Sequence, residues 1–265
     1  MELIIKATGV CNFTCSFCAS SKLDILHSPR EVPQLIKSYI KKFKPQNVIV
    51  TGGEPLCCEP EYFYDLLDTC NCHISITSNL KNFWLESSKW VPLFKNEMID
   101  VCTSFNYGIT RRWSLTEVYT EQMFKDVMYS FKQLVGYMPP FISVIDESNA
   151  SRFLDHVRLA KELGTTCRLN NATVAGRQAV GYPRHKMFKL WLGVIAAGLE
   201  EYEVNCMERK LGRCPLNTSG QCQQNIRAIY VGNNDRLYVS DCEEKLNQFY
   251  EKIDNVPNKK CLNCD

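Results

Sequence analysis

The sequence predicts an α/β fold, a partial (β/α)6 TIM-like barrel followed by a small C-terminal extension. Short apolar runs alternate six times with segments of helical periodicity, and 265 residues suffice for one barrel-sized domain with an appendage. Six units indicate an open barrel rather than a closed one of eight strands. Because helical crossovers make the strands parallel, polar groups at their carboxyl ends should share one face of the barrel.

The six predicted strands are short runs rich in apolar and β-branched residues, as in a parallel sheet buried on both faces. They span residues 2–7, 47–51, 72–77, 98–104, 141–145 and 165–170. The predicted helices between and after them span residues 33–43, 62–68, 83–94, 115–134, 150–163 and 187–202. We expect the third helix to be interrupted at Pro92, because proline removes a backbone hydrogen bond.

A cysteine-rich tail begins near Val204. Residues 226–231 and 236–240 alternate around the turn sequence Gly-Asn-Asn-Asp and predict a hairpin, and residues 243–253 predict a helix. No low-complexity linker separates this tail from the rest of the chain. We therefore expect a barrel, residues 1–203, and a hairpin-plus-helix extension, residues 204–265, that packs on it.

Composition restricts the partners and the compartment. The net charge is +2 with interspersed signs, which gives no reason to expect a nucleic acid or a membrane surface as partner. No apolar run approaches the ~18 residues of a membrane span, and no secretory signal begins the chain. Fifteen cysteines without such a signal favour metal ligation in a reducing, cytoplasmic compartment over disulfide bonds.

Three cysteines, Cys11, Cys15 and Cys18, lie directly after the first strand, in a segment (residues 9–20) that we call the cysteine loop. No histidine or acid lies between them. Structural zinc normally takes four ligands, and ferredoxin spacings bring a fourth cysteine nearby. Three thiolates on one loop therefore indicate an iron–sulfur cluster with one iron open to a small molecule; core cysteines or a zinc knuckle are the alternative.

The spacing Cys-x3-Cys-x-aromatic-Cys, with Phe17 at the aromatic position, resembles the signature of the radical S-adenosylmethionine (SAM) enzymes. A second match, Thr-Gly-Gly-Glu-Pro, ends the second strand. Its glycines permit close backbone approach, and its acid can accept a hydrogen bond from an amino group. The resemblance implies that Gly52, Gly53 and Glu54 contact the amino group of SAM, although a strand-to-helix turn alone could also explain the motif.

Polar residues end three further strands. They are Ser78 and Asn79 on the third, Ser104 and Asn106 on the fourth, and Arg168 on the sixth. The resemblance implies that those on the third and fourth strands hold the ribose or carboxylate of SAM; Arg168 could meet the carboxylate. Short polar residues are also common turn formers, and Arg168 could equally meet the substrate or be simply solvated. The pair at residues 176–177 resembles a segment that follows the sixth strand in peptide-modifying relatives.

The tail contains the cysteines Cys206, Cys214, Cys222, Cys242, Cys261 and Cys264. Their order around a hairpin resembles the twitch form of the SPASM extension of radical SAM enzymes. The resemblance implies an auxiliary [4Fe-4S] cluster held by Cys222, Cys242, Cys261 and Cys264. Cys206 and Cys214 are then not needed as ligands. A zinc site of four thiolates is the physical alternative.

The implied cofactors are two [4Fe-4S] clusters and SAM. Reduction of the first cluster, by a partner such as flavodoxin or ferredoxin, would cleave SAM to methionine and a 5′-deoxyadenosyl radical that removes a hydrogen atom from the substrate. An auxiliary cluster could accept an electron from the substrate radical. This favours an oxidoreductase that dehydrogenates its substrate or forms a thioether or C–C bond; no catalytic side chain is assigned.

Two substrate classes remain open from the sequence. One is a ribosomally synthesised peptide; the other is a small polar metabolite such as an aminocyclitol, sugar or nucleoside. The barrel starts at residue 2, so we expect no N-terminal domain that binds a leader peptide. This expectation weakens the case for a peptide substrate. A zinc- or cluster-bound interaction module without SAM cleavage is an alternative of another class.

Overall fold

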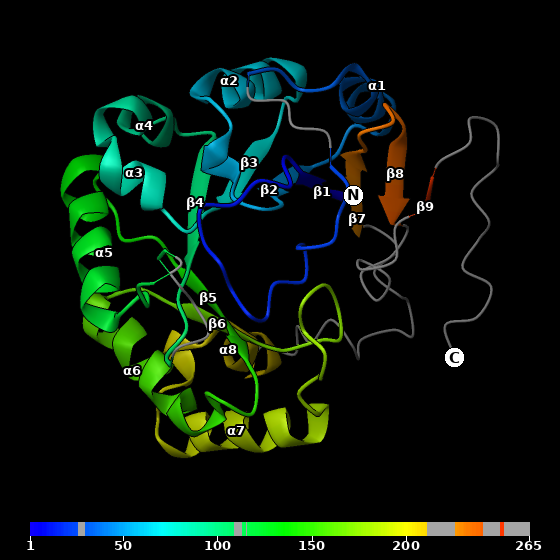
Figure 1. Ribbon diagram of the computed structural model, residues 1–265. Coiled ribbons are helices and arrows are strands. Elements are labelled where there is room, and N and C mark those ends of the chain that lie inside the picture. The colour runs from blue at the N-terminus through cyan, green and yellow to red at the C-terminus, as the bar shows by residue number, and fades with distance from the viewer. Residues whose placement is uncertain (26–29, 109–112, 115, 211–225, 241–249, 252–265) are drawn as a thin grey trace.

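A computed structural model of the chain describes residues 1–25, 30–108, 113–114, 116–210, 226–240 and 250–251. Its described strands form one sheet of order β6-β5-β4-β3-β2-β1-β7-β8-β9. Strands β1 to β6 pair in parallel, and helices cover the outer side of this curved sheet (Figure 1). The prediction of a parallel α/β sheet in an open, partial (β/α)6 barrel is confirmed.

The strands are β1 (Glu2–Lys6), β2 (Asn47–Thr51), β3 (His73–Thr77), β4 (Ile99–Ser104), β5 (Phe141–Ile145), β6 (Cys167–Asn171), β7 (Ile226–Val231), β8 (Leu237–Ser240) and β9 (Tyr250–Glu251). The helices are α1 (Gln34–Phe43), α2 (Pro60–Thr69), α3 (Lys81–Leu85), α4 (Ser87–Phe94), α5 (Glu121–Val135), α6 (Phe153–Leu163), α7 (Arg184–Ala196) and α8 (Val204–Lys210). Short 3-10 turns lie at Pro55–Cys57, Ala150–Arg152 and Glu200–Tyr202.

The strands present alternate side chains to the helices and to the interior of the barrel. In β1, Leu3 and Ile5 are fully buried in the core between sheet and helices, whereas Lys6 on the opposite face is half-buried. The last residues of β2 and β4, Thr51 and Ser104, are half-buried in the same way. The inner face is therefore polar where the strands end, which is where a barrel places its site.

The helix predicted for residues 83–94 breaks at a different residue from the one expected. Two helices cover this segment: α3 ends at Leu85, and α4 runs on through Pro92. The break lies at Glu86, whose φ of −138° and ψ of 55° are not helical. Pro92 lies in the second turn of α4, two residues before its end, where it removes one helical hydrogen bond without breaking the helix.

Two other helices differ from their predicted bounds because of local capping. The helix predicted from residue 115 begins at Glu121, where the Thr120 hydroxyl accepts a hydrogen bond from the Met123 N–H at 3.2 Å. The last predicted barrel helix, α7, ends at Ala196, and Gly198, with a φ of +62°, precedes the separate 3-10 turn.

The predicted hairpin is confirmed as β7 and β8, which pair antiparallel. Strand β7 also pairs in parallel with β1, so the hairpin continues the barrel sheet. The helix predicted at residues 243–253 is wrong at Tyr250–Glu251, which pair with β8 as β9; its other residues lie outside the described part. The hydrophobic pattern of that segment suits either structure over so short a length.

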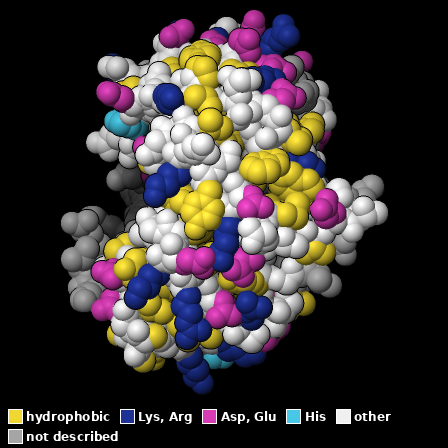
Figure 2. Space-filling view, turned by 90° about the vertical axis from the view of Figure 1, so that its left-hand side faces the viewer, with side chains coloured by type: hydrophobic (Ala, Val, Ile, Leu, Met, Phe, Trp, Pro, Cys, Tyr) yellow, Lys and Arg dark blue, Asp and Glu magenta, His cyan; other side chains and the backbone are white. Residues whose placement is uncertain are grey.

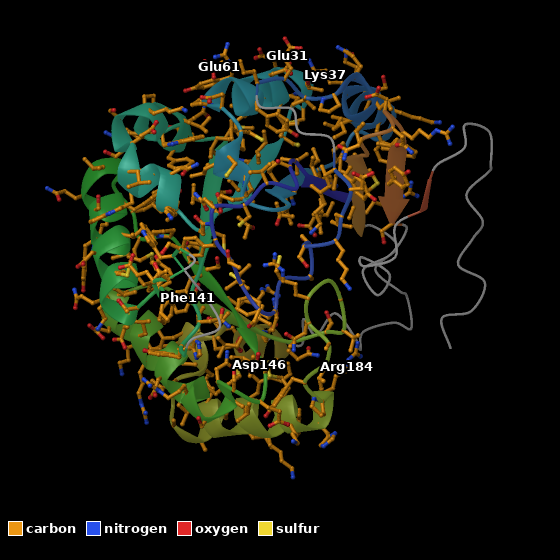
Figure 3. All side chains as sticks on the ribbon, viewed as in Figure 1. Glu31, Lys37, Glu61, Phe141, Asp146 and Arg184 are labelled. Atoms are coloured by element: carbon orange, nitrogen blue, oxygen red, sulfur yellow. The ribbon has the colours of Figure 1, made fainter. Side chains whose placement is uncertain are left out.

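The outer surface is mixed in charge. Acidic and basic side chains are interspersed over the face shown in Figure 2. Charged side chains lie on the outside of the molecule and aromatic ones between sheet and helices. Glu31, Lys37 and Glu61 lie at the outer rim near α1 and α2 (Figure 3). Phe141 packs against Phe124 in the core between sheet and helices. Within the described ranges, no helix has both the length and the apolar character needed to cross a membrane.

Candidate metal and cofactor site

The cysteine loop leaves β1 and lies over the carboxyl ends of the strands. Backbone hydrogen bonds fix its beginning to the end of β2: the Gly53 N–H donates to the Thr8 carbonyl at 2.6 Å, and the Glu54 N–H donates to the Val10 carbonyl at 2.8 Å. The Asn12 side chain accepts from the Asn79 amide at 2.7 Å. The first half of the loop is thus tied to the ends of β2 and β3.

Gly52 and Gly53 permit this contact because no side chain would fit between the two segments. A Cβ at Gly52 would lie 2.6 Å from the Thr8 carbonyl oxygen, and one at Gly53 would lie 2.2 Å from that of Val10. Gly52 also has a φ of +138°, which L-residues rarely adopt. The close backbone approach predicted for these glycines is made to the cysteine loop itself.

The other end of the loop is held by the segment after β6. The Arg177 N–H donates to the Cys18 carbonyl at 3.0 Å. A Cβ at Gly176, whose φ is +58°, would lie 2.2 Å from the same oxygen. Close backbone packing from β2 and from the segment after β6 therefore brackets the three cysteines.

The three thiols of the loop are unbridged. Cys11 is exposed as a residue and Cys15 and Cys18 are half-buried. Burial of the sulfur raises the pKa of Cys11 to about 12, and the nearby Glu54, Cys15 and Cys18 raise this pKa further. The Phe13 N–H donates a hydrogen bond to the sulfur at 3.4 Å and lowers the pKa in part. The thiol of Cys11 is therefore protonated at neutral pH, and a metal must displace that proton on binding.

The chemistry of the donor set, three thiols without a histidine or acid between them, suits an iron–sulfur cluster. Among the described residues, no three histidine, cysteine, aspartate or glutamate side chains come together closely enough to hold one metal ion. An iron–sulfur cluster is held by thiolates that each bind a different iron, so its ligands are separated. The three thiols lie on one loop that backbone hydrogen bonds hold at both ends, and Phe17, half-buried, is part of the same loop.

The Glu54 carboxylate is bound by groups of the protein. It is 2% exposed and accepts hydrogen bonds from the Ser78 hydroxyl at 2.6 Å, the Asn79 N–H at 2.7 Å and the Leu56 N–H at 3.0 Å. The residues predicted to contact SAM at the ends of β2 and β3 are thus brought together, and much of their hydrogen bonding is to one another. Sequence spacing carries no signal for such a network.

The remaining predicted residues lie on the strands as expected. The Asn106 side chain is buried and its amide donates to the Val144 carbonyl at 2.5 Å, which ties the end of β4 to β5. Ser104 is half-buried at the end of β4. Arg168 on β6 donates to the Asn205 side chain at 3.5 Å, and its charge opposes the burial that raises the pKa of Cys102 to about 12. Arg168 and Cys102 therefore lie near each other on the inner face.

No family model and no curated protein matches the sequence. Among solved structures, anSMEcpe with bound AdoMet (SAM) matches with a TM-score of 0.63 and 16% identity, over 93% of this chain and 75% of that one. Streptococcus suis SuiB bound to the precursor peptide SuiA matches with a TM-score of 0.64 and 15% identity, over 95% of this chain and 61% of SuiB. SuiB has also been solved with S-adenosylmethionine, at a TM-score of 0.62. The fold is that of the radical SAM enzymes.

An aromatic cluster adjoins the cysteine loop of this radical SAM fold, and the sequence analysis did not identify it. Phe13, between Cys11 and Cys15, meets Trp113 and Tyr119 edge-on at ring-centre distances of 5.6 and 5.1 Å. The Lys81 ammonium lies 4.8 Å from the centre of the Trp113 ring and donates to its carbonyl at 2.5 Å. This packing anchors the loop from the side of β4 and α5.

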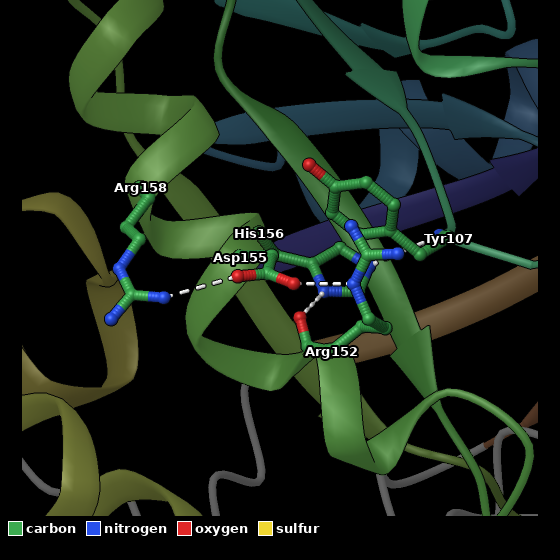
Figure 4. Close-up of polar contacts among 5 residues, drawn as sticks. All are labelled: Tyr107, Arg152, Asp155, His156 and Arg158. Atoms are coloured by element: carbon green, nitrogen blue, oxygen red, sulfur yellow. Dashed lines mark hydrogen bonds and ion pairs between the residues drawn. The ribbon is translucent and has the colours of Figure 1, made fainter.

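His156 is a buried histidine that joins two segments of the barrel (Figure 4). It is fully buried in α6; its Nδ1–H donates to the Arg152 carbonyl at 2.9 Å, and its Nε2 accepts from the Tyr107 N–H at 3.4 Å. Burial lowers its pKa to about 4. A neutral imidazole thus fixes the segment after β4, next to Asn106, to α6.

Lys6 places a positive charge inside the barrel near Cys18. Burial lowers the pKa of its ammonium to about 8, and an electrostatic interaction with Cys18 acts in the opposite direction. The ammonium is therefore charged at neutral pH. No motif singles out this residue, because its surroundings form only when the cysteine loop folds over the strand ends.

The predicted auxiliary ligands Cys222, Cys242, Cys261 and Cys264 lie outside the described residues, as does Cys214. Cys206 is described: it is buried in α8, and its N–H donates to the Glu203 carboxylate at 2.8 Å. In the described part of the tail, the β7–β8 hairpin precedes Cys242 directly. The auxiliary cluster therefore remains a prediction.

Proposed function

We propose that this chain is a radical SAM enzyme in which Cys11, Cys15 and Cys18 hold a [4Fe-4S] cluster with one open iron. The observation that supports the proposal best is the fixed position of these thiols over the strand ends, between the glycines of β2 and the segment after β6. Such a cluster, when bound and reduced by a donor such as flavodoxin or ferredoxin, supplies the electron for reductive cleavage of SAM.

The protein's own residues orient the reactants. Gly52 and Gly53 keep the end of β2 close to the cysteine loop, and Glu54 joins that turn to the end of β3. Arg168 and Ser104 line the inner face, where they can bind the polar groups of SAM or of the substrate. Exclusion of water from the site while the reactants are bound would protect a reactive radical.

The substrate we propose is a ribosomally synthesised peptide, modified oxidatively. Support comes from the fold shared with SuiB, which was solved with its precursor peptide, and with anSMEcpe, which was solved with a Cp18Cys peptide. An auxiliary cluster on the tail cysteines would accept the second electron that dehydrogenation or thioether formation requires. The division into a barrel, residues 1–203, and an auxiliary domain, residues 204–265, is part of this proposal.

The test is anaerobic reconstitution followed by reduction with dithionite and quantification of 5′-deoxyadenosine. Wild-type protein should form it, and the triple variant Cys11→Ala, Cys15→Ala, Cys18→Ala should not. A matched control is Cys70→Ala with Cys72→Ala, buried thiols next to the opposite end of β3. Undiminished cleavage by the triple variant would reject the proposed ligands.

A further inference from the structure

Three asparagine side chains form a chain of hydrogen bonds, here called the asparagine chain, that joins the cysteine loop to the segment after β3. Asn12 is the residue after Cys11, and its Nδ2 donates to Oδ1 of Asn82, in α3, at 2.8 Å. Its Oδ1 accepts from Nδ2 of Asn79, at the end of β3, at 2.7 Å. All three asparagines are buried or half-buried. Both polar atoms of the Asn12 side chain therefore hold the cysteine loop.

Backbone groups at both ends fix the direction of the asparagine chain. At one end, the Lys81 N–H donates to Oδ1 of Asn79 at 2.9 Å, so the NH2 group of Asn79 must face Asn12. At the other end, the Leu56 carbonyl accepts from Nδ2 of Asn82 at 2.6 Å, so the oxygen of Asn82 must face Asn12. The side chain at position 12 must therefore accept on one side and donate on the other, as an amide does.

The asparagine chain shares two of its residues with the hydrogen bonds of the buried Glu54 carboxylate. That carboxylate accepts from the Leu56 N–H at 3.0 Å and from the Asn79 N–H at 2.7 Å. Leu56 and Asn79 thus bind Glu54 through their N–H groups and the asparagine chain through other atoms. A displacement of Asn12 would move the proposed cluster ligand Cys11 relative to the residues proposed to contact SAM.

We propose that Asn12 is a positioning residue that places Cys11 relative to the turn after β2, an inference that rests on the proposed function. It acts through its neighbours, because its amide holds the cysteine loop against Asn79 and Asn82. SAM bound at an open iron must meet the cluster and the turn after β2 at the same time. A loop that is held less firmly should therefore bind SAM more weakly while it keeps its iron.

The experiment titrates the reduced holoprotein with SAM and follows the EPR spectrum of the cluster, with iron measured in the same samples. Asn12→Ala should keep the iron content of wild type and bind SAM about tenfold more weakly, as expected when the contribution of a hydrogen bond is lost. Asn12→Asp should also bind SAM more weakly, because a carboxylate oxygen would face the oxygen of Asn82. Thr14→Ala, at an exposed position of the same loop, is the matched control and should bind SAM as wild type does.

A double variant tests whether Asn12 and Asn82 act together. Asn12→Ala combined with Asn82→Ala should lose less SAM affinity than the product of the two single losses, because either change alone breaks the bond between them. Losses that multiply would overturn the inference, since the two residues would then act independently.

Wild-type SAM affinity in Asn12→Ala overturns the inference while leaving the proposed function standing. If Asn12→Ala does not fold, Asn12→Asp, which keeps the shape of the side chain, decides by the same criterion. Loss of iron from both variants also overturns the inference, because Asn12 would then act on the binding of the cluster itself. Wild-type protein whose cluster does not respond to SAM would reject the proposed function and this inference together.

Discussion

At the scale of single residues, Glu54 shows how one side chain can organise a site that it helps to form. Its carboxylate receives two backbone N–H groups and one hydroxyl, from Leu56, Asn79 and Ser78. Hydrogen bonds to a charged acceptor are the stronger ones, and they lie in a buried position here. We infer that Glu54 fixes the turn after β2 in addition to any contact with SAM.

Replacing Glu54 with Gln should therefore lower the free energy of unfolding by roughly 1.5–3 kcal/mol, because the buried network loses its charge. Weaker binding of SAM should accompany this loss, while the cluster content falls less. Urea denaturation and a SAM titration measure the two effects, with Glu61→Gln as a control at an exposed position. Unchanged stability with weaker SAM binding would mean that the carboxylate acts on SAM alone.

Gly53→Ala tests the packing of the turn against the cysteine loop. The added methyl group would meet the Val10 carbonyl at 2.2 Å, and backbone atoms on both sides cannot move away independently. We expect a loss of about 1–3 kcal/mol in stability and a clear loss of bound iron. Gly193→Ala is the control, because a Cβ there meets nothing within 4 Å. Equal iron content in both variants would contradict the role of Gly53.

At the scale of elements, the cysteine loop depends on strand ends that are themselves fixed. His156 joins α6 to the segment after β4 only while its imidazole is neutral, because Nε2 must accept the Tyr107 N–H. Around it, Arg152 stacks on Tyr107 and pairs with Asp155, which also pairs with Arg158 at 3.1 Å. The nearby positive charge of Arg152 adds to the preference for the neutral form.

The hydrogen bonds of His156 predict that the stability of the fold depends on pH. The pKa of His156 is about 4 in the folded chain and 6.5 in the unfolded chain, so the unfolded chain binds the extra proton. The stability that His156 contributes is present above pH 6.5 and is lost as the pH falls toward 4. Between pH 6.5 and 5 the loss should be about 2 kcal/mol. Denaturant unfolding of wild type and His156→Gln at both pH values measures it; equal pH dependence in the two would contradict the assignment.

At the scale of the whole molecule, the tail is continuous with the barrel sheet. Strand β7 pairs with β1, so the hairpin that leads to Cys242 extends the same sheet from which the cysteine loop emerges. The auxiliary cluster that we propose would thus use a cysteine that follows, in the chain, a hairpin of the barrel sheet. The same extension suits the oxidative chemistry that we propose for a peptide substrate.

The proposed auxiliary cluster predicts how much iron the protein binds. Wild-type protein should bind about eight irons, and the variant with Cys222, Cys242, Cys261 and Cys264 changed to alanine about four. The variant should still form 5′-deoxyadenosine but no product, because the substrate radical lacks an electron acceptor. Iron, zinc and sulfide analyses of anaerobic protein measure this. Stoichiometric zinc with only four irons would replace the auxiliary cluster with a zinc site.

The sequence was sufficient to predict the six-strand barrel, because β-branched runs and helical periodicity report local structure directly. The candidate metal site could be predicted for a similar reason, since its three cysteines lie close together in the chain. Contacts between distant segments were missed: Glu54 with Ser78 and His156 with Tyr107. The break at Glu86 was missed because proline marks a lost hydrogen bond without fixing where a helix ends.

The most direct test of the central claim is the EPR spectrum of the reduced protein before and after SAM is added. The tail-cysteine variant is the sample, so that only the first cluster contributes. If Cys11, Cys15 and Cys18 hold a cluster with an open iron, its g values should change when SAM binds that iron. A spectrum that SAM leaves unchanged, with four irons bound, would contradict the open site and with it the proposed function.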